Sequence, residues 1–322
     1  MPQIVALKLS IPVEMRGLRL DQALAELLQD YSRSRLQQWI RAGEVTLDGQ
    51  LPRVRERLQG GESVCIQAEI VEQTANEAEP IPLDLVYEDE ALLVINKPAG
   101  LVVHPAAGNP AGTLLNALLH FDASLAGLPR AGIVHRLDKG TSGLMVVART
   151  LKAHKKLVDA LQARSVKREY LALVNSVLTA GGRVDAPIGR HHVDRKRMAV
   201  VAGGKEAISH YRVEERYRAH TLTRVSLETG RTHQIRVHMA HVHAPVVGDP
   251  VYGGRLRLPK GATEALKQAL QNFRRQALHA TQLALQHPES GEMISWQAAV
   301  PEDMAHLIQA LRDDVSAQQD NA

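Results

Sequence analysis

The sequence predicts an α+β protein of two domains, in which a mixed sheet with flanking helices follows a small N-terminal module. The chain has 322 residues, and domains of roughly 100 to 200 residues make two cores the natural expectation. Residues 71–82 are acidic, lack apolar periodicity and contain two prolines near their end, as linkers do. We therefore expect domains at 1–70 and 83–322, joined by a linker at 71–82.

Residues 1–70 show helical spacing first and strand-like runs afterwards. The first helix is expected over 20–29, and the second begins after Ser32 as N-cap and ends at Gly43. Strands are expected at 44–47 and 63–67, with a turn at Asp48–Gly49. Basic residues crowd the polar side of the second helix: Arg33, Arg35 and Arg41. This order, with the segment AGEVTLDGQ, resembles the S4 RNA-binding domain; the alternative is a generic helical cap with solvated arginines.

The remainder of the chain alternates short β-rich runs with helical patterns in no regular order, which favours a mixed sheet over a doubly wound unit. The runs are LDLVYEDE, ALLVINKP, GLMVVART, REYLALVN and TRVSLE. The helical patterns fall at 113–120, 151–163, 233–242 and 262–272.

Composition narrows the class of protein. Cys65 is the only cysteine, which excludes an internal disulfide and a multi-cysteine metal site. No apolar run approaches the roughly 20 residues of a membrane span, and no secretory signal begins the chain, so a cytoplasmic location without membrane partners is expected. No G-x-G-x-x-G or Walker sequence is present, so no nucleotide cofactor is expected.

Positive charge is concentrated in one part of the chain. Residues 91–260 hold 26 Lys and Arg against 11 Asp and Glu. An excess of this size indicates a polyanionic partner, with nucleic acid first, although a solvated basic face is the alternative. Aromatic residues make up only 3% of the chain, which argues against a sheet that stacks several bases.

The segment GIVHRLDKGTSG, residues 132–143, has the composition of a functional loop. It places one carboxylate, Asp138, among basic residues and glycines between two apolar runs. Taken alone, an aspartate beside arginines is more often a structural ion pair than a catalytic group.

This segment resembles the catalytic loop of the RluA-type RNA pseudouridine synthases, whose hallmark is H-R-L-D. Further blocks match in the family's order: INKPAGLVVHP, KREYLALV and ETGRTHQIRVHMAHVHAPVVGDPVYGG. The resemblance covers roughly 85–300 and implies the pseudouridine synthase fold, a mixed and largely antiparallel sheet with flanking helices. The match is closest to members that modify helix 69 of the large-subunit (23S) ribosomal RNA. It therefore implies isomerisation of uridines in that RNA, without cofactor or metal.

The resemblance also implies the catalytic residues. Asp138 corresponds to the catalytic carboxylate, acting either as nucleophile toward the sugar or as base toward a sugar proton. Arg231 corresponds to its basic partner, because a nearby guanidinium favours the charged carboxylate; a phosphate clamp or a structural pair is the alternative. Tyr170 corresponds to the active-site tyrosine, and its alternative is core packing.

Two further residues correspond to substrate-binding positions of the family. The target base must leave its stack to react. Arg136 matches the arginine that fills the vacated place, and its alternative is a pair with Asp138. Ile235 matches the apolar residue against the base, although its helical position would otherwise indicate core.

The sequence also allows two alternative functions. Four histidines at 233, 238, 241 and 243 could bind zinc in a hydrolase, but no Cys, Asp or Glu nearby completes a familiar ligand pattern. The second rival is a non-catalytic RNA-binding or ribosome-assembly factor on the same fold. The set Asp138, Tyr170 and Arg231 argues against it. The partner expected in either case is large-subunit ribosomal RNA or its precursor particle, and no protein partner is evident.

Overall fold

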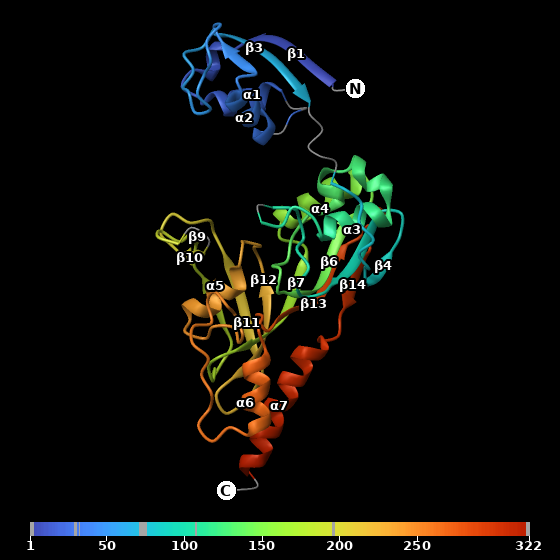
Figure 1. The fold of residues 1–322 in the computed structure, drawn as a ribbon, viewed down its shortest axis with the longest axis vertical. Coiled ribbons are helices and arrows are strands. Elements are labelled where there is room, and N and C mark those ends of the chain that lie inside the picture. The colour runs from blue at the N-terminus through green and yellow to red at the C-terminus, as the bar shows by residue number, and fades with distance from the viewer. Residues whose placement is uncertain are drawn as a thin grey trace. The chain divides into compact units, whose positions relative to one another are not determined.

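The computed structural model describes residues 3–28, 31, 33–70, 76–106, 108–194 and 197–319 (Figure 1). Its contacts divide the chain into two compact units, Met1–Ala75 and Asn76–Ala322. No helix of the described residues is long and apolar enough to cross a membrane.

The N-terminal unit packs two helices on a three-stranded antiparallel sheet of order β1-β3-β2. Its elements are β1 (Gln3–Ser10), α1 (Leu20–Leu27), α2 (Arg33–Ala42), β2 (Val45–Leu47) and β3 (Ser63–Ile70). The apolar stripes of both helices meet the sheet in one core around Leu24, Leu36 and Ile66. At the turn after β2, Asp48 and Gly49 both have positive φ, as a two-residue hairpin turn requires. Ser32, the expected N-cap of α2, lies outside the described residues.

The larger unit is built on a nine-stranded sheet of order β4-β5-β6-β13-β7-β12-β11-β8, with β14 paired to β13. Among the described strand pairs, β13 with β6 is the only parallel one, so the expectation of a mixed, largely antiparallel sheet is confirmed. Its strands are β4 (Leu85–Glu88), β5 (Leu92–Lys97), β6 (Ser142–Ala148), β7 (Lys167–Val174), β8 (Gly182–Asp185), β11 (Ile208–Arg216), β12 (Thr221–Leu227), β13 (Leu278–Gln286) and β14 (Met293–Gln297). A separate ribbon pairs β9 (Ile188–Arg190) with β10 (Met198–Val200).

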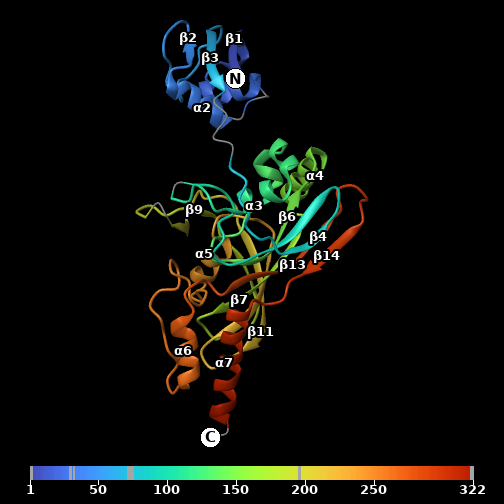
Figure 2. The same cartoon turned by 45° about the vertical axis from the view of Figure 1, so that its right-hand side comes forward.

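Helices cover the sheet and explain its uninterrupted apolar strands. They are α3 (Leu114–Phe121), α4 (Leu151–Gln162), α5 (Gln234–His241), α6 (Glu264–Asn272) and α7 (Glu302–Gln319). Odd-numbered residues of β5 and β6 face the largest core, which includes α3, and even-numbered residues face a second core against α4. Strands buried on both faces lose the alternation of apolar and polar residues. At the far end of the sheet, α6 and α7 lie side by side (Figures 1 and 2).

The described end of the expected linker is part of the larger unit. Asn116 of α3 donates from its side chain to the carbonyl of Glu77 at 2.8 Å, and the backbone N–H of Glu79 donates to the carbonyl of Asn116 at 3.0 Å. The side chain of Glu79 accepts from the N–H of Gly112. Residues 77–79 are therefore fastened to α3.

Candidate active site

Asp138 lies in the loop 133–141, between a short 3-10 turn (Pro129–Gly132) and β6. The entry to the loop depends on Gly132, which has φ +79° and packs so closely on β6 that a Cβ would lie 1.9 Å from the carbonyl oxygen of Ala148. The N–H of Thr141 donates back to the carbonyl of Asp138. The side chain of Asp138 is 16% exposed, so the carboxylate is sheltered but open to a substrate.

A buried lysine fastens this loop to the segment KPAGL. Lys97 Nζ donates to the carbonyls of Pro98 at 2.7 Å, Leu101 at 2.9 Å and Lys139 at 3.4 Å. Burial lowers the pKa of Lys97 to about 8, although the charge of Asp138 acts to raise it. The lysine thus holds together two segments that are 42 residues apart in the chain.

Arg236 of α5 is the ion-pair partner of Asp138. Its Nη1 donates to Asp138 Oδ2 at 2.9 Å, while Nε and Nη2 bind both oxygens of Asp249 at 2.7 and 2.9 Å. Burial acts to lower the pKa of Arg236, but the hydrogen bonds and charges of Asp249 and Asp138 outweigh burial and raise it. A planar guanidinium suits this bridge, because its donors are arranged in a fixed fork.

Asp249 and Tyr252, both from the block GDPVYGG, support Arg236 from behind. Besides the guanidinium, Asp249 Oδ1 accepts the backbone N–H groups of Val251 and Tyr252. The Tyr252 ring centroid lies 5.0 Å from Arg236 Cζ, within the range of a cation–π contact. Asp249 and Tyr252 together therefore fix the position of Arg236.

His233 is the second basic side chain beside Asp138. It stands before α5 in a left-handed conformation with φ 57°, and its Nε2 lies 3.8 Å from Asp138 Oδ1. Its Nδ1 shares a hydrogen bond of 2.8 Å with the Tyr252 hydroxyl. Burial lowers the pKa of His233, so the ring is neutral near pH 7. Among the described residues, Asp138 Oδ1 accepts no hydrogen bond.

The structure brings Tyr170 and Ile235 to the same region. Both are buried, Tyr170 on β7 and Ile235 on α5, and both belong to the largest core. Burial raises the pKa of Tyr170, and the nearby charge of Asp138 raises it further against the opposing effect of Arg168. The phenol therefore stays protonated at neutral pH. Both residues also pack as core residues, as the alternative reading expected.

Arg231 differs from expectation, whereas for Arg136 only the alternative, a pair with Asp138, is absent from the structure. Arg136 is exposed, and Asp138 pairs with Arg236 instead of with this neighbour. Arg231, the expected partner of Asp138, is corrected: its Nε donates to the carbonyl of Glu206 at 2.8 Å, and Arg236 makes the ion pair. Arg231 precedes the turn into α5, so its side chain leaves in another direction. The available signal was an arginine flanked by buried apolar residues in HQIRVHM.

The histidine cluster does not assemble. His238 bonds through Nδ1 to Ser209 and through Nε2 to the carbonyl of Ala186, and His233 bonds to Tyr252. In the part of the chain that the structure describes, no group of three His, Cys, Asp or Glu side chains is placed to hold a metal ion.

The expected RNA-contacting arginines lie on α2 of the N-terminal unit. Arg33 donates to the buried Asp21 through Nε and Nη2, yet its side chain remains 44% exposed. Arg41 is exposed and donates to Gln37 at 3.3 Å. The side chain of Arg35 lies outside the described residues.

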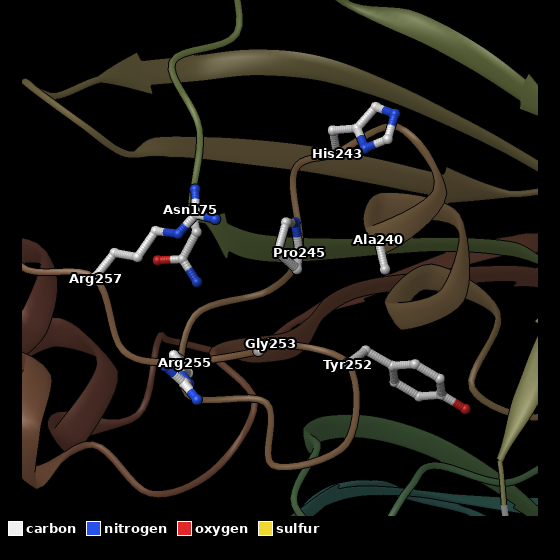
Figure 3. A pocket seen from close by; sticks show the side chains of 9 residues that line it. Asn175, Ala240, His243, Pro245, Tyr252, Gly253, Arg255 and Arg257 are labelled. Carbon is white, nitrogen blue, oxygen red and sulfur yellow. The ribbon is translucent and has the colours of Figure 1, made fainter. Parts of the chain in front are cut away.

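A pocket of about 360 Å³ adjoins Tyr252 (Figure 3). No acidic side chain lines it; the polar lining side chains are Asn175, His243, Tyr252, Arg255 and Arg257. Tyr252 thus contributes to this pocket and to the support of Arg236.

Comparisons with known proteins give matches in both units of the chain. A family model described as RNA pseudouridylate synthase matches residues 91–241, and one for the S4 domain matches residues 18–64. The chain is 57% identical over 304 residues to "Ribosomal large subunit pseudouridine synthase D" of Xanthomonas campestris pv. campestris, covering 94% of this chain and 92% of that protein. The protein of the same name from Pseudomonas aeruginosa is 58% identical, covering 95% and 96%. Among solved structures, "Human RNA Pseudouridylate Synthase Domain Containing 4" aligns with a TM-score of 0.55 and 26% identity, covering 71% of this chain and 93% of that one.

Proposed function

This chain belongs to the RNA pseudouridylate synthase family, and from that premise we propose that it isomerises uridines in helix 69 of large-subunit ribosomal RNA with Asp138 as the catalytic carboxylate. The observation that carries the assignment to Asp138 is its asymmetric environment. One oxygen is held by Arg236 at 2.9 Å, and the other accepts no hydrogen bond among the described residues. Such a carboxylate is oriented by its arginine and has one oxygen free to react.

The reaction requires a group of this kind. The N1–C1′ bond of uridine breaks, the uracil turns and a C5–C1′ bond forms. The proton lost from C5 is balanced by one gained at N1, so there is no net oxidation or reduction. An ionised Asp138 acts either by attack on C1′ or by removal of a sugar proton. Arg236, bonded to Asp138 Oδ2, orients the carboxylate for either step. Tyr170, on β7, supplies a protonated phenol and an aromatic face for the uracil.

Access to the uridine requires that the base leaves its stack, which costs a few kcal/mol. In this proposal the exposed guanidinium of Arg136 enters the vacated place, because it is planar and can also contact phosphate. Ile235 provides the apolar surface behind the extruded base. Arg231, near the entrance to α5, is half-buried and remains available for phosphate contact.

The N-terminal unit contributes RNA capture in this proposal. Its match to the S4 domain and the arginines of α2 (Arg33, Arg35 and Arg41) support contacts with the RNA backbone, which position a substrate without reading sequence. The concentration of positive charge in 91–260 supplies a second electrostatic attraction.

The target and the catalytic group are tested together by mapping pseudouridines in large-subunit ribosomal RNA from cells that lack this protein. Helix 69 should lose pseudouridines, and wild-type protein should restore them, whereas Asp138→Asn should not. Asp185→Asn is the matched control, because Asp185 is half exposed and pairs with Arg183 on the surface. Unchanged helix 69 in the deficient cells would refute the target, and restoration by Asp138→Asn would refute the catalytic role.

A further inference from the structure

A buried arginine beside the candidate active site has no counter-ion among the described residues. Arg168 of β7 is 7% exposed, and its buried Nε has no hydrogen-bond partner. No other hydrogen bond or ion pair of its guanidinium occurs within the described residues. Since arginine stays charged in proteins, Arg168 carries a largely buried positive charge that no carboxylate among the described residues pairs with.

The position of Arg168 points toward the reacting groups. Residues two apart on a strand face the same side, so Arg168 shares its face with Tyr170. The guanidinium lies so close to Gly230 that a Cβ there would be 2.8 Å from Nη1, and Gly230 belongs to the loop that leads into His233 and α5. The adjacent carboxylate, Glu169, lies 3.5 Å from Arg224 and is engaged there.

The neighbouring histidine, His135, does not serve as a hydrogen-bond partner of the guanidinium. Burial and the charge of Arg168 lower the pKa of His135 to about 3, and its Nε2 accepts the backbone N–H of Val146 at 3.1 Å. His135 is therefore neutral and already bound to the strand. A buried charge without a partner is strongly unfavourable, so the missing anion is expected to arrive with the substrate.

We infer that Arg168 binds a phosphodiester group next to the target uridine and thereby positions that nucleotide over Asp138. This inference rests on the proposed function, because phosphodiesters are the anionic groups that an RNA substrate brings to the site. A guanidinium suits them, since it can donate two parallel hydrogen bonds to phosphate oxygens. Gly230 leaves room for the guanidinium but adds no side chain that would compete for it.

The test combines variants with a chemically altered RNA. A short helix 69 RNA is made with a neutral methylphosphonate in place of the phosphate on the 5′ side or the 3′ side of the target uridine. Pseudouridine formation is then measured for wild type and for Arg168→Gln on each RNA and on the unmodified RNA. Arg224→Gln is the control, because Arg224 lies on the neighbouring strand and is held by Glu169 and Glu214.

We expect Arg168→Gln to lower kcat/KM about 10- to 100-fold on unmodified RNA, the loss typical of one charged hydrogen-bond partner. At one of the two positions, the methylphosphonate should lower the kcat/KM of wild type by a similar factor. The same methylphosphonate should leave the kcat/KM of Arg168→Gln at its value on unmodified RNA. Arg224→Gln should respond to that methylphosphonate as wild type does. The melting temperature of Arg168→Gln should be unchanged or higher, because the substitution removes an uncompensated charge; a residue with a purely structural role would lower it.

The inference would be overturned if wild type forms pseudouridine but each methylphosphonate lowers kcat/KM of Arg168→Gln by the same factor as that of wild type, so that the losses combine independently at both phosphate positions. The proposed function would instead be refuted if wild type forms no pseudouridine in the unmodified RNA and the protein also adds no pseudouridine to helix 69 of cellular RNA. The methylphosphonate series on wild type needs no variant, so it decides the matter even where Arg168→Gln does not fold: wild-type rates that are equal on all three RNAs also overturn the inference.

Discussion

Two carboxylates, one in each unit of the chain, are held by arginines in different ways. Asp21 is fully buried and accepts hydrogen bonds from Arg19, Arg33 and Gln37; we call these four residues the Asp21 network. Asp138 is partly open and accepts a side-chain hydrogen bond only from Arg236 among the described residues. A carboxylate whose oxygens are all occupied stabilises a fold, whereas one with an unoccupied oxygen can react with a substrate.

The arginines differ as well. In the Asp21 network the side chains of Arg19 and Arg33 are 30% and 44% exposed, so water can replace Asp21 as their partner. Arg236 is buried, and its second carboxylate, Asp249, has a side chain that is 0% exposed. In the candidate active site, therefore, Arg236 is firmly held, whereas the carboxylate of Asp138 keeps one oxygen open. The comparison predicts which substitutions affect catalysis and which affect only stability.

The largest effect is expected for Asp138→Asn. Removal of the reactive charge should lower pseudouridine formation by about 10²- to 10⁴-fold or more, while melting temperature and RNA affinity change little because the amide keeps the shape. Rapid-quench assays of pseudouridine formation and binding by filter retention measure the two effects on one preparation. Asp21→Asn in the same assay should keep near wild-type turnover, and equal loss in both variants would remove the distinction drawn here.

The next largest effect is expected for Arg236→Gln. It leaves the buried Asp249 without its partner, and breaking a buried pair costs about 3–5 kcal/mol, a fall in melting temperature on the order of 10 °C. Calorimetry measures this cost, and activity should fall too because Asp138 loses its orientation. Arg312→Gln, which removes a half-exposed pair with Glu215, should cost only about 0–1 kcal/mol. A similar cost for both substitutions would show that Asp249 is not dependent on Arg236.

Asp21→Asn should destabilise the N-terminal unit by about 1–3 kcal/mol, less than Arg236→Gln because the released arginines reach water. The chain contains two tryptophans. A Trp296→Phe background therefore leaves Trp39, which is buried in the core of the N-terminal unit, as the single reporter in fluorescence-monitored urea unfolding. No change in the Trp39 transition would mean that the Asp21 network contributes nothing to stability.

The pH dependence of the same transition provides a fourth test. Burial acts to raise the pKa of Asp21, but hydrogen bonds from Arg33, Gln37 and Arg19 outweigh it and lower the pKa below the ordinary value. The stabilisation is therefore complete above the unfolded-state pKa of about 3.9 and is lost as the pH falls through the lower folded-state pKa. Trp39 unfolding in wild type should become easier below about pH 4, and Asp21→Asn should lack this component. Parallel curves for the two proteins would contradict the assignment.

The smallest effect is expected for RNA binding by α2. Arg41→Gln should weaken binding a few-fold and reduce the slope of log affinity against log salt by about 1, through loss of one phosphate contact. Arg33→Gln should reduce the slope less, because part of the Arg33 charge is engaged by Asp21. Affinities measured at four salt concentrations compare the two variants. A slope identical to wild type for Arg41→Gln would exclude this residue from the RNA contact.

Local sequence was sufficient for much of the fold. The helices over 20–29 and 33–42, those over 151–163 and 262–272, and the apolar strands β5 and β6 were all predicted to within a few residues, because each pattern records which side of one element is buried. The resemblance to the family also placed Asp138 in a loop. By contrast, the sequence pattern did not predict β13, although this strand lies in the centre of the sheet between β6 and β7.

In the candidate site, too, some features follow from the sequence and others depend on the tertiary structure. The motif H-R-L-D identified Asp138, but its ion pair joins residues 98 positions apart, and the choice between Arg231 and Arg236 depends on where α5 begins and how it packs. The roles of Lys97, Asp249 and Tyr252 likewise arise from contacts between distant segments. The sequence by itself determined the local elements and the candidate for the reactive residue, because periodicity and motifs are properties of neighbours in the chain. Only the tertiary structure decided which charges meet, because burial and pairing depend on how the elements pack together.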